Sequence, residues 1–164
     1  MISQIPITNS KEACHIFTDV KRDMISQGID QWDEVYPNEK IIETDILNNH
    51  AFGYCADGVL MGYIAINEYF DKEYNDLDWK HPDNRPLIVH RLAVHSKFQG
   101  LGIAKALMLF AEDKAINEGY ATIRLDAFSK NPKALKFYDN LDYQFVGEVT
   151  FRKGVFYCFE KSMQ

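Results

Sequence analysis

Residues 87–108, LIVHRLAVHSKFQGLGIAKALM, contain the clearest signal of the fold of this chain. The mostly apolar run over 87–94 has the length of a strand and is typical of a central strand covered on both faces. Apolar residues then recur at helical spacing: Ile103, Leu107, Ala111 and Ala115. Because Gly119 follows where a helix would stop, the pattern predicts a strand, a connection and a helix over 101–118.

Strand and helix patterns alternate along the rest of the chain. Glycine and capping residues bound the further predicted helices, at 11–27, 38–49 and 131–140. Apolar or alternating runs predict the further strands, at 3–8, 51–56, 59–68, 121–128, 143–151 and 155–161. Asp57-Gly58 is a hairpin-turn signal. The polar segment 71–86, which contains Pro82 and Pro86, is expected to be a loop.

The length of the chain and the order of these elements predict a fold class. At 164 residues the chain is long enough for one domain with a substantial core, and no repeat or linker divides it. Strand–helix alternation, a β-rich middle and a final strand pair predict an α/β or α+β sheet covered by helices. We therefore expect a single domain over residues 1–164.

Composition and charge narrow the function classes. The net charge of −6 and the pI near 5.3 argue against a nucleic-acid partner, because binding phosphates needs a basic surface. No apolar span approaches the ~20 residues that cross a bilayer. The start, MISQIPITNS, has no basic segment before an apolar run, so we expect a cytoplasmic protein without a membrane partner. The cysteines and histidines lack the spacing of a disulfide framework or a metal site.

The segment Gln99-Gly100-Leu101-Gly102-Ile103-Ala104 lies where the predicted helix begins. Glycines at a helix start let backbone N–H groups approach a ligand closely, and the helix dipole favours an anion such as a pyrophosphate. The P-loop pattern is absent, and Lys105 occupies the third glycine position of the dinucleotide fingerprint. A glycine turn without any ligand stays open as an alternative.

Two motifs in order make residues 50–160 resemble the GNAT superfamily of N-acetyltransferases. The acyl-CoA loop pattern of that family, [QR]xxGx[GA], is matched by Gln99, Gly102 and Ala104. Its later helix pattern, NxxAxxFYxxxGF, is matched by Asn131, Ala134, Phe137 and Tyr138. One departure is visible: Asp142 stands where the family usually has glycine.

The resemblance implies a fold and a coenzyme site. The implied fold is a mixed, mostly antiparallel sheet of about six or seven strands, with splayed central strands and about four flanking helices. Acetyl-CoA is the implied co-substrate, with no metal. Backbone groups of Leu92 and Val94 would bind its pantetheine arm, and the glycine turn its pyrophosphate. The implied coenzyme-binding residues are Leu92, Ala93, Val94, Gln99, Gly100, Leu101, Gly102, Ile103, Ala104, Lys105, Asn131 and Tyr138.

The resemblance also implies catalytic roles. Tyr138 would be the general acid that protonates the leaving thiolate, and the alternative is a tyrosine of the core. His90 is a candidate base for removing a proton from the amine, with Glu68 or a water chain as rivals. The amine would attack directly in a ternary complex. No cysteine lies in the matched motifs, which disfavours an acyl-enzyme.

The acceptor is the least specified part of the interpretation. Aromatic and acidic side chains that suit a cationic amine are Trp32, Tyr36, Glu68 and Tyr69. The leading hypothesis is acetylation of a primary amine of a small molecule. A protein lysine or N-terminal acetyltransferase is one alternative, and a non-catalytic acyl-CoA sensor is another. A homodimer is an expectation from the family only.

Overall fold

The computed structural model describes residues 1–82 and 85–164, and within them the chain divides into two compact units. Each unit is described by itself. Strand β4 and helix α3 contribute residues to both. The expectation of a single domain over residues 1–164 stays a prediction. Unit 1 is Met1–Ile66 with Arg91–Ala111, and unit 2 is Asn67–His90 with Glu112–Gln164.

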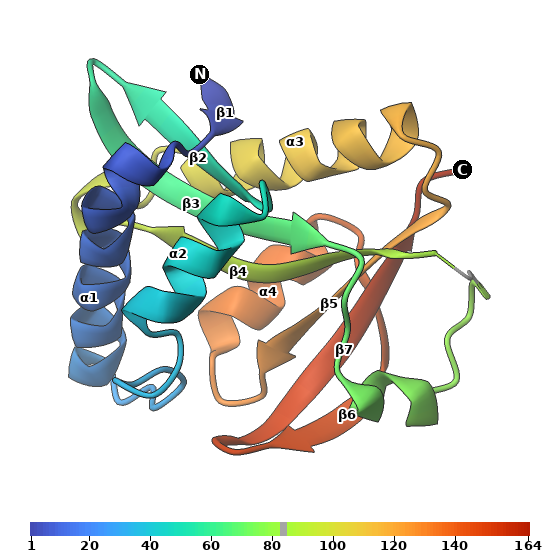
Figure 1. Cartoon of the computed structure of the whole chain (residues 1–164). Helices are drawn as coiled ribbons and strands as arrows, with labels where there is room; N and C mark the ends of the chain where they lie inside the picture. The colour runs from blue at the N-terminus through green and yellow to red at the C-terminus, as the bar shows by residue number, and fades with distance from the viewer. Residues whose placement is uncertain (83–84) are drawn as a thin grey trace. The chain divides into compact units, whose positions relative to one another are not determined.

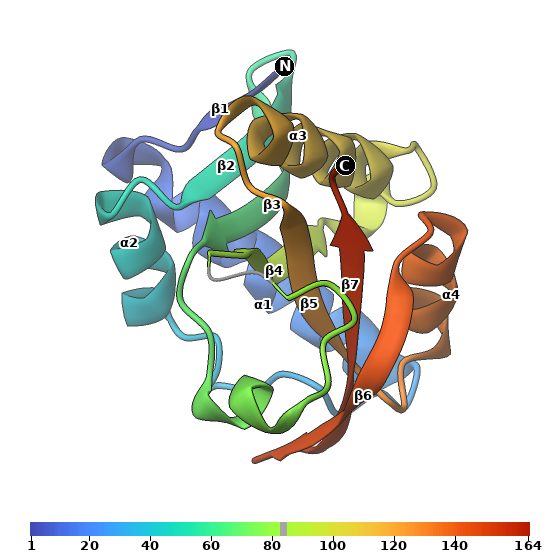
Figure 2. The same ribbon diagram turned by 90° about the vertical axis from the view of Figure 1, so that its right-hand side faces the viewer.

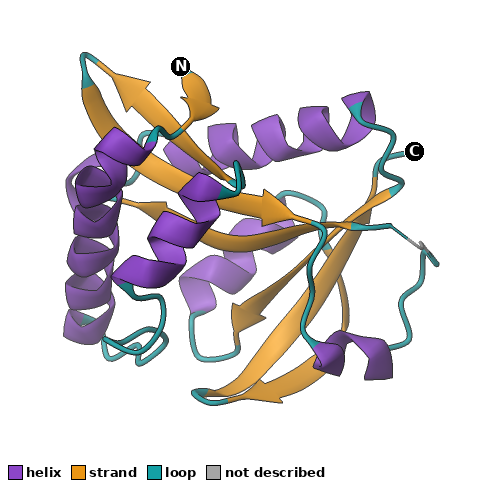
Figure 3. Ribbon diagram, in the orientation of Figure 1, coloured by secondary structure: helices purple, strands orange, loops and turns teal. Residues whose placement is uncertain are grey.

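The described residues form helices and strands of a mixed α+β class (Figure 1, Figure 3). The α-helices are α1 (Ser10–Ser26), α2 (Glu39–Leu47), α3 (Ile103–Asn117) and α4 (Pro132–Asn140). The 3-10 helices are η1 (Ile7–Asn9), η2 (Lys72–Asp76) and η3 (Ser96–Phe98). The strands are β1 (Ile2–Gln4), β2 (Ala51–Ala56), β3 (Val59–Asn67), β4 (Leu87–Val94), β5 (Thr122–Phe128), β6 (Gln144–Phe151) and β7 (Gly154–Ser162).

The strand order confirms the predicted fold class. It runs β1-β2-β3-β4-β5-β7-β6 in a seven-stranded sheet. The β1–β2, β2–β3, β5–β7 and β6–β7 pairs are antiparallel, whereas β4 and β5 are parallel from Leu87–Ile123 to Val89–Leu125. The structure is therefore the expected mixed, mostly antiparallel sheet flanked by four α-helices among the described residues.

Unit 1 has helices on both faces of β3. A Cβ atom at Gly62 would lie 2.8 Å from the Ile103 side chain at the start of α3. The next residue, Tyr63, points the other way, and its ring centroid lies 4.9 Å from that of Phe17 on α1. Because successive side chains of a strand alternate between faces, these contacts place α1 and the start of α3 on opposite sides of the strand.

Unit 2 is built on the antiparallel strands β5, β7 and β6, which can be followed in Figure 2. On one face, the buried Glu160 carboxylate accepts a hydrogen bond from Lys80 N at 2.6 Å. On the other face, Lys161 Nζ donates to Glu112 of α3 at 2.9 Å. The segment after η2 and the end of α3 therefore lie on opposite faces of β7.

Local signals in the sequence explain the element boundaries. Asn38 and Asn131 cap α2 and α4, since each Oδ1 accepts a hydrogen bond from the backbone N–H three residues later, at 3.0 and 3.1 Å. Asp57 and Gly58 both have positive φ, 51° and 74°, as a tight hairpin turn requires. Gly28 ends α1 with φ 76°.

Two sequence predictions of local structure need correction. The strand predicted over 3–8 ends at Gln4, and Ile7–Asn9 form the 3-10 helix η1. The loop predicted over 71–86 contains the 3-10 helix η2, which buries the ring of Tyr74. A polar average over that segment hides its single buried aromatic residue. Residues 83–84 of the predicted loop lie outside the described residues.

Asp142, where the sequence departs from the family pattern, adopts the conformation that favours glycine. Its φ is 64°, and the following amide, Tyr143 N, donates to Tyr138 O at 3.1 Å to close the end of α4. We expect Asp142→Gly to raise the free energy of unfolding by about 1 kcal/mol, because glycine carries no Cβ penalty there. Thermal unfolding measures the gain. Asp139→Gly, inside α4, should instead lower the free energy of unfolding by about 1 kcal/mol. A lower free energy of unfolding in both variants would contradict the interpretation that position 142 favours glycine.

Candidate functional site

The glycine turn before α3 is open where a ligand would approach it. Gly100 and Gly102 have φ of 79° and 80°, and a Cβ atom built at either one meets no atom within 4 Å. The Gln99 side chain joins the turn to the end of β4, because its Nε2 donates to Val94 O at 3.1 Å. All of these residues belong to unit 1. The turn is thus anchored at its start and uncovered at its glycines within unit 1.

The start of α3 adds backbone donors to this turn. Ala106 N donates to Gly102 O at 3.0 Å, which is the hydrogen bond between residues four apart that opens an α-helix. Amides before that bond have no helical carbonyl to reach, and they point out of the helix start with a partial positive charge. Those amides belong to Ile103, Ala104 and Lys105. The donors and the open glycines fit a pyrophosphate, as the sequence predicts.

The entry to the turn is held by Asp19 of α1. Its carboxylate accepts hydrogen bonds from Ser96 N at 2.7 Å and from Ser96 Oγ at 2.9 Å, at the start of η3. The same carboxylate lies 3.5 Å from Nδ1 of His95. These contacts fix the direction in which the chain leaves β4. Sequence reasoning did not single out Asp19, because it lies on a separate helix far along the chain.

The implied pantetheine residues lie on the last part of β4 in unit 1. Ala93 and Val94 are buried, and Leu92 is half-buried. The β4 backbone continues directly into His95, whose N–H donates to Met61 O of β3 at 3.0 Å. The strand therefore holds these residues in an extended conformation. Their contact with a coenzyme stays a prediction.

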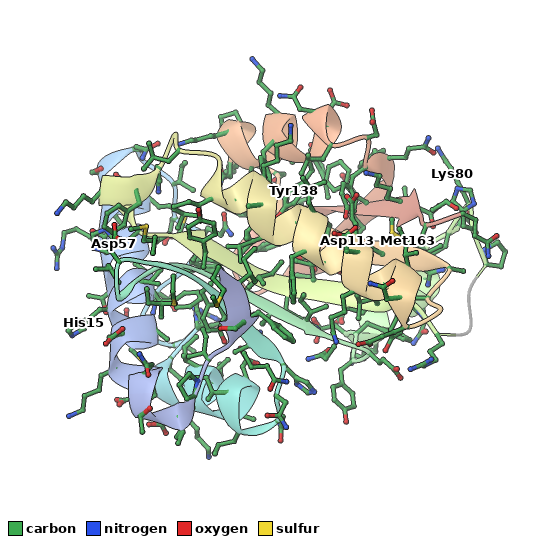
Figure 4. The ribbon with its side chains drawn as sticks, turned by 90° about the horizontal axis from the view of Figure 1, so that it is seen from above. His15, Asp57, Lys80, Asp113, Tyr138 and Met163 are labelled. Atoms are coloured by element: carbon green, nitrogen blue, oxygen red, sulfur yellow. The ribbon has the colours of Figure 1, made fainter. Side chains whose placement is uncertain are left out.

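Tyr138 lies on α4 in the interior of unit 2 and is labelled in Figure 4. Its side chain is buried, and its ring centroid lies 6.0 Å from that of Tyr143 and 6.2 Å from that of Phe159. Burial, followed by the charge of Asp126, raises the pKa of Tyr138 above its usual value. The phenol is therefore protonated at neutral pH, as a proton donor must be. A purely structural role fits the same burial.

Asn131 has a structural role that the sequence predicts. Its side chain caps α4 through Ala134 N, and Pro132 occupies the first helical position. A second role toward the coenzyme stays a prediction. The cap fixes where α4 begins and hence which residues of the helix face the sheet, among them Tyr138.

His90 lies on β4 in unit 2, half-buried, with Nε2 2.7 Å from Asn67 Oδ1. The parallel pair Val89–Leu125 fixes the register of β4 against β5. The next residue on each strand points to the opposite face, so His90 and Asp126 share one face of unit 2. The structure thus places a carboxylate on the same face of unit 2 as the candidate histidine base.

Asp126 is the residue of this region that sequence reasoning missed. Its Oδ2 accepts a hydrogen bond from the hydroxyl of the buried Tyr74 at 2.6 Å. Burial raises the pKa of Asp126 to about 6, against the opposing hydrogen bond of Tyr74. The available signal was a lone carboxylate inside the otherwise apolar end of a strand, LDAF at 125–128. A carboxyl group with such a pKa can accept a proton near neutral pH.

Glu68, the rival base, has hydrogen-bond partners that lower its affinity for a proton. Its Oε1 accepts hydrogen bonds from the Tyr120 hydroxyl at 2.6 Å and from Arg85 Nε at 2.7 Å. These bonds lower the pKa of Glu68, which is exposed on the surface of unit 2. A carboxylate stabilised in this way binds a proton less readily than Asp126, whose pKa is raised.

The aromatic acceptor candidates differ in exposure. Trp32 in unit 1 is buried, with its ring centroid 5.4 Å from that of Phe17. Tyr36, also in unit 1, is half-buried, and its hydroxyl accepts a hydrogen bond from Arg91 at 2.8 Å. Tyr69 in unit 2 is 72% exposed. Of the three, only Tyr69 presents most of its ring to solvent within its own unit.

The described residues contain neither a membrane-spanning helix nor a metal-binding cluster. No helix described in the structure has both the length and the apolar character needed to span a bilayer. Within residues 1–82 and 85–164, no group of three or more His, Cys, Asp or Glu side chains is arranged to hold a metal ion.

Comparison with known proteins assigns the family. The model of the acetyltransferase (GNAT) family matches residues 15–143, so the chain belongs to this family, which indicates an acyltransferase. An acetyltransferase of the GNAT family from Streptococcus agalactiae is 26% identical, with a TM-score of 0.82 over 99% of this chain and 94% of that one. No curated protein matches the sequence significantly.

Two further solved structures show the same fold at lower identity. The PaiA N-acetyltransferase of Thermoplasma acidophilum, solved with coenzyme A, is 18% identical, with a TM-score of 0.73 over 99% of this chain and 98% of that one. The ribosomal-protein-S18-alanine N-acetyltransferase of Escherichia coli is 16% identical, with a TM-score of 0.71 over 100% of this chain and 94% of that one. The description of the Escherichia coli protein names its acceptor, an alanine of a ribosomal protein. At this identity the likeness shows the fold alone, and the acceptor class of the present chain stays open.

Proposed function

We propose that this chain is an acetyl-CoA-dependent N-acetyltransferase that acetylates a primary amine of a small molecule by direct attack in a ternary complex. The observation that carries the proposal is the turn from Gln99 to Lys105. It combines two uncovered glycines at positive φ with the first amides of α3. The coenzyme A complex of the Thermoplasma neighbour supports the choice of co-substrate.

In this proposal each catalytic residue handles one proton. A base takes a proton from the ammonium form of the substrate, and the free amine nitrogen then forms the new bond to the acetyl carbon. The carbon–sulfur bond breaks, and Tyr138 protonates the thiolate. The second proton leaving the nitrogen restores the phenol through water, and the base releases the first proton to solvent. The products are one amide and one thiol, and no acyl-enzyme forms.

The base in this proposal comes from the face of unit 2 that carries His90 and Asp126. Both side chains are half-buried, and each has a hydrogen-bond partner that fixes its position. Glu68 is less suited because its pKa is lowered. A half-buried base is accessible to a substrate but has little contact with water, so it takes its proton from the substrate amine.

Calorimetric titration with acetyl-CoA and, separately, with free CoA tests the proposal. We expect micromolar binding of acetyl-CoA, followed by release of free thiol when a suitable amine is present. An amine panel of polyamines, amino acids and peptides then distinguishes a small-molecule enzyme from a protein acetyltransferase. If the protein binds acetyl-CoA but none of these amines causes thiol release, the alternative of an acyl-CoA sensor is favoured.

Gly102→Ala is expected to weaken acetyl-CoA binding by about tenfold or more, because a methyl group would occupy the open side of the turn. Gly119→Ala is the matched control: Gly119 also has a positive φ, 78°, and no atom within 4 Å of its Cβ position. Both variants should lose similar stability. Equal affinity of the two variants for acetyl-CoA would remove the turn from the coenzyme site.

A further inference from the structure

The segment Asp71–His81 of unit 2 forms a strap across one face of β5 and β7. It begins with η2 and continues through Leu77, whose side chain would lie 2.9 Å from a Cβ atom at Gly147 on β6. In Figure 2 the strap is the green segment beside β6. Its far end reaches Lys80, labelled at the edge of Figure 4.

A buried pair of opposite charges clamps the far end of the strap. Arg124 and Glu160 are cross-strand neighbours on β5 and β7, 6% and 0% exposed. Glu160 Oε1 accepts hydrogen bonds from Lys80 N at 2.6 Å and from His81 N at 3.2 Å. Arg124 Nη2 donates to His81 O at 2.9 Å. The two charges therefore bind the backbone of the strap on both its donor and acceptor groups.

The clamp is connected to Tyr74 through Trp79. The Arg124 guanidinium carbon lies 4.3 Å from the Trp79 ring centroid, and Trp79 Nε1 donates to Tyr74 O at 2.8 Å. Tyr74 in turn places its hydroxyl 2.6 Å from Asp126 Oδ2. A continuous chain of contacts thus runs from the buried charge pair to the Asp126 carboxylate, and every member belongs to unit 2.

We propose that Tyr74 is a positioning residue that orients Asp126 as the proton acceptor for the amine, and that the Arg124–Glu160 clamp serves to hold Tyr74 in place. The inference rests on the proposed function. In the proton-transfer step, the ammonium N–H bond breaks and the Asp126 oxygen not bonded to Tyr74 takes the proton. The products of that step are a neutral amine and a neutral carboxylic acid.

Several titratable groups face Asp126 from the elements around it. Tyr74 and Asp71 belong to the strap. Cys158 on β7 is the cross-strand partner of Asp126, and His90 on β4 lies on the same face as Asp126. The charge of Asp126 also raises the pKa of Tyr138 on α4. The hydrogen bond from Tyr74 favours the ionised carboxylate of Asp126, whereas burial and the charge of Asp71 favour its neutral form. Loss of the Tyr74 hydroxyl should therefore raise the pKa of Asp126 above about 6.

The test compares the wild type with Tyr74→Phe by two readouts. Carboxyl ¹³C NMR follows the titration of Asp126 directly, and the pH profile of kcat follows the reaction. We expect the pKa of Asp126 to rise by about one unit and the acid limb of kcat to move by the same amount. At pH 6 kcat should fall about fivefold, while at pH 8.5 it should be almost unchanged.

Two further variants separate positioning from general damage. Trp79→Phe removes the hydrogen bond to Tyr74 O but keeps a ring beside Arg124, so both readouts should move in the same direction by a smaller amount. Tyr157→Phe is the control. It removes a phenol from β7 at the position next to Cys158, on the opposite face from Asp126, and both readouts should stay at their wild-type values.

The readouts distinguish the failure of the inference from the failure of the proposed function. An unchanged Asp126 pKa in folded Tyr74→Phe overturns the inference. A raised pKa with an unmoved acid limb also overturns it, and then points to His90 as the base. A wild type without turnover on any amine contradicts the proposed function itself, whereas the NMR titration still decides whether Tyr74 positions Asp126.

Discussion

Tyr138→Phe is expected to lower kcat by about 100-fold or more while the Kd for acetyl-CoA stays close to the wild-type value. In the proposed function, the hydroxyl that this variant loses protonates the leaving thiolate, and general acid catalysis typically contributes 10²–10⁴-fold. The phenyl ring still fills the space between Tyr143 and Phe159, so the fold should survive. Thiol release at saturating amine, together with calorimetric titration of acetyl-CoA, measures the two quantities.

Tyr143→Phe is the matched control for this experiment. Tyr143 is buried in the same unit, its hydroxyl donates to Glu112 at 3.1 Å, and the proposed function gives it no catalytic role. The Tyr143→Phe variant should have a somewhat lower free energy of unfolding and a kcat close to that of the wild type. If Tyr138→Phe behaves in the same way, Tyr138 is a core residue and the proposed acid must be sought elsewhere. A loss of turnover accompanied by unfolding would also contradict the expectation of a retained fold.

Asp45→Ala is expected to lower the free energy of unfolding by about 3–5 kcal/mol, which corresponds to a fall in Tm of roughly 6–20 °C. Asp45 on α2 is 5% exposed and binds Arg91 through both oxygens, with Arg91 Nε at 2.8 Å from Oδ2. The same carboxylate accepts the hydroxyl hydrogen bond of Tyr63 at 2.6 Å. Its removal leaves a buried guanidinium and a buried phenol without their partner.

The exposed ion pair between Lys114 and Glu118 provides the comparison. Glu118→Ala should change the free energy of unfolding by less than about 0.5 kcal/mol, because solvent screens exposed pairs. Denaturant unfolding of both variants gives the two values. A loss below about 1 kcal/mol for Asp45→Ala would mean that water or rearranged side chains satisfy Arg91 in the variant.

The predicted helices and strands agree closely with the structure where the signals are local. The strands at 51–56 and 87–94 match β2 and β4 at both ends. Asn131-Pro132 marks the start of α4, and the glycine turn precedes α3 as expected. Periodicity, capping and backbone conformation depend on residues close together in the sequence, so they can be predicted from the sequence alone.

Elements with mixed signals were harder to predict. The strand predicted over 3–8 gives way to η1, because a short apolar run at a chain end has little local information to distinguish strand from turn. The polar composition of the segment after β3 predicts neither η2 nor the burial of Tyr74. Its structure depends on Asp126 and Glu160, which follow much later in the chain.

The fold class, the family resemblance, and the positions of the glycine turn and Tyr138 could all be predicted from the amino-acid sequence. These depend on local patterns and on motif order. Only the tertiary structure revealed the contacts between distant residues: Tyr74 with Asp126, 52 residues apart, and Asp45 with Arg91, 46 residues apart. A buried charge needs a partner, but the sequence does not say which of many distant residues supplies it, because folding alone brings the two together.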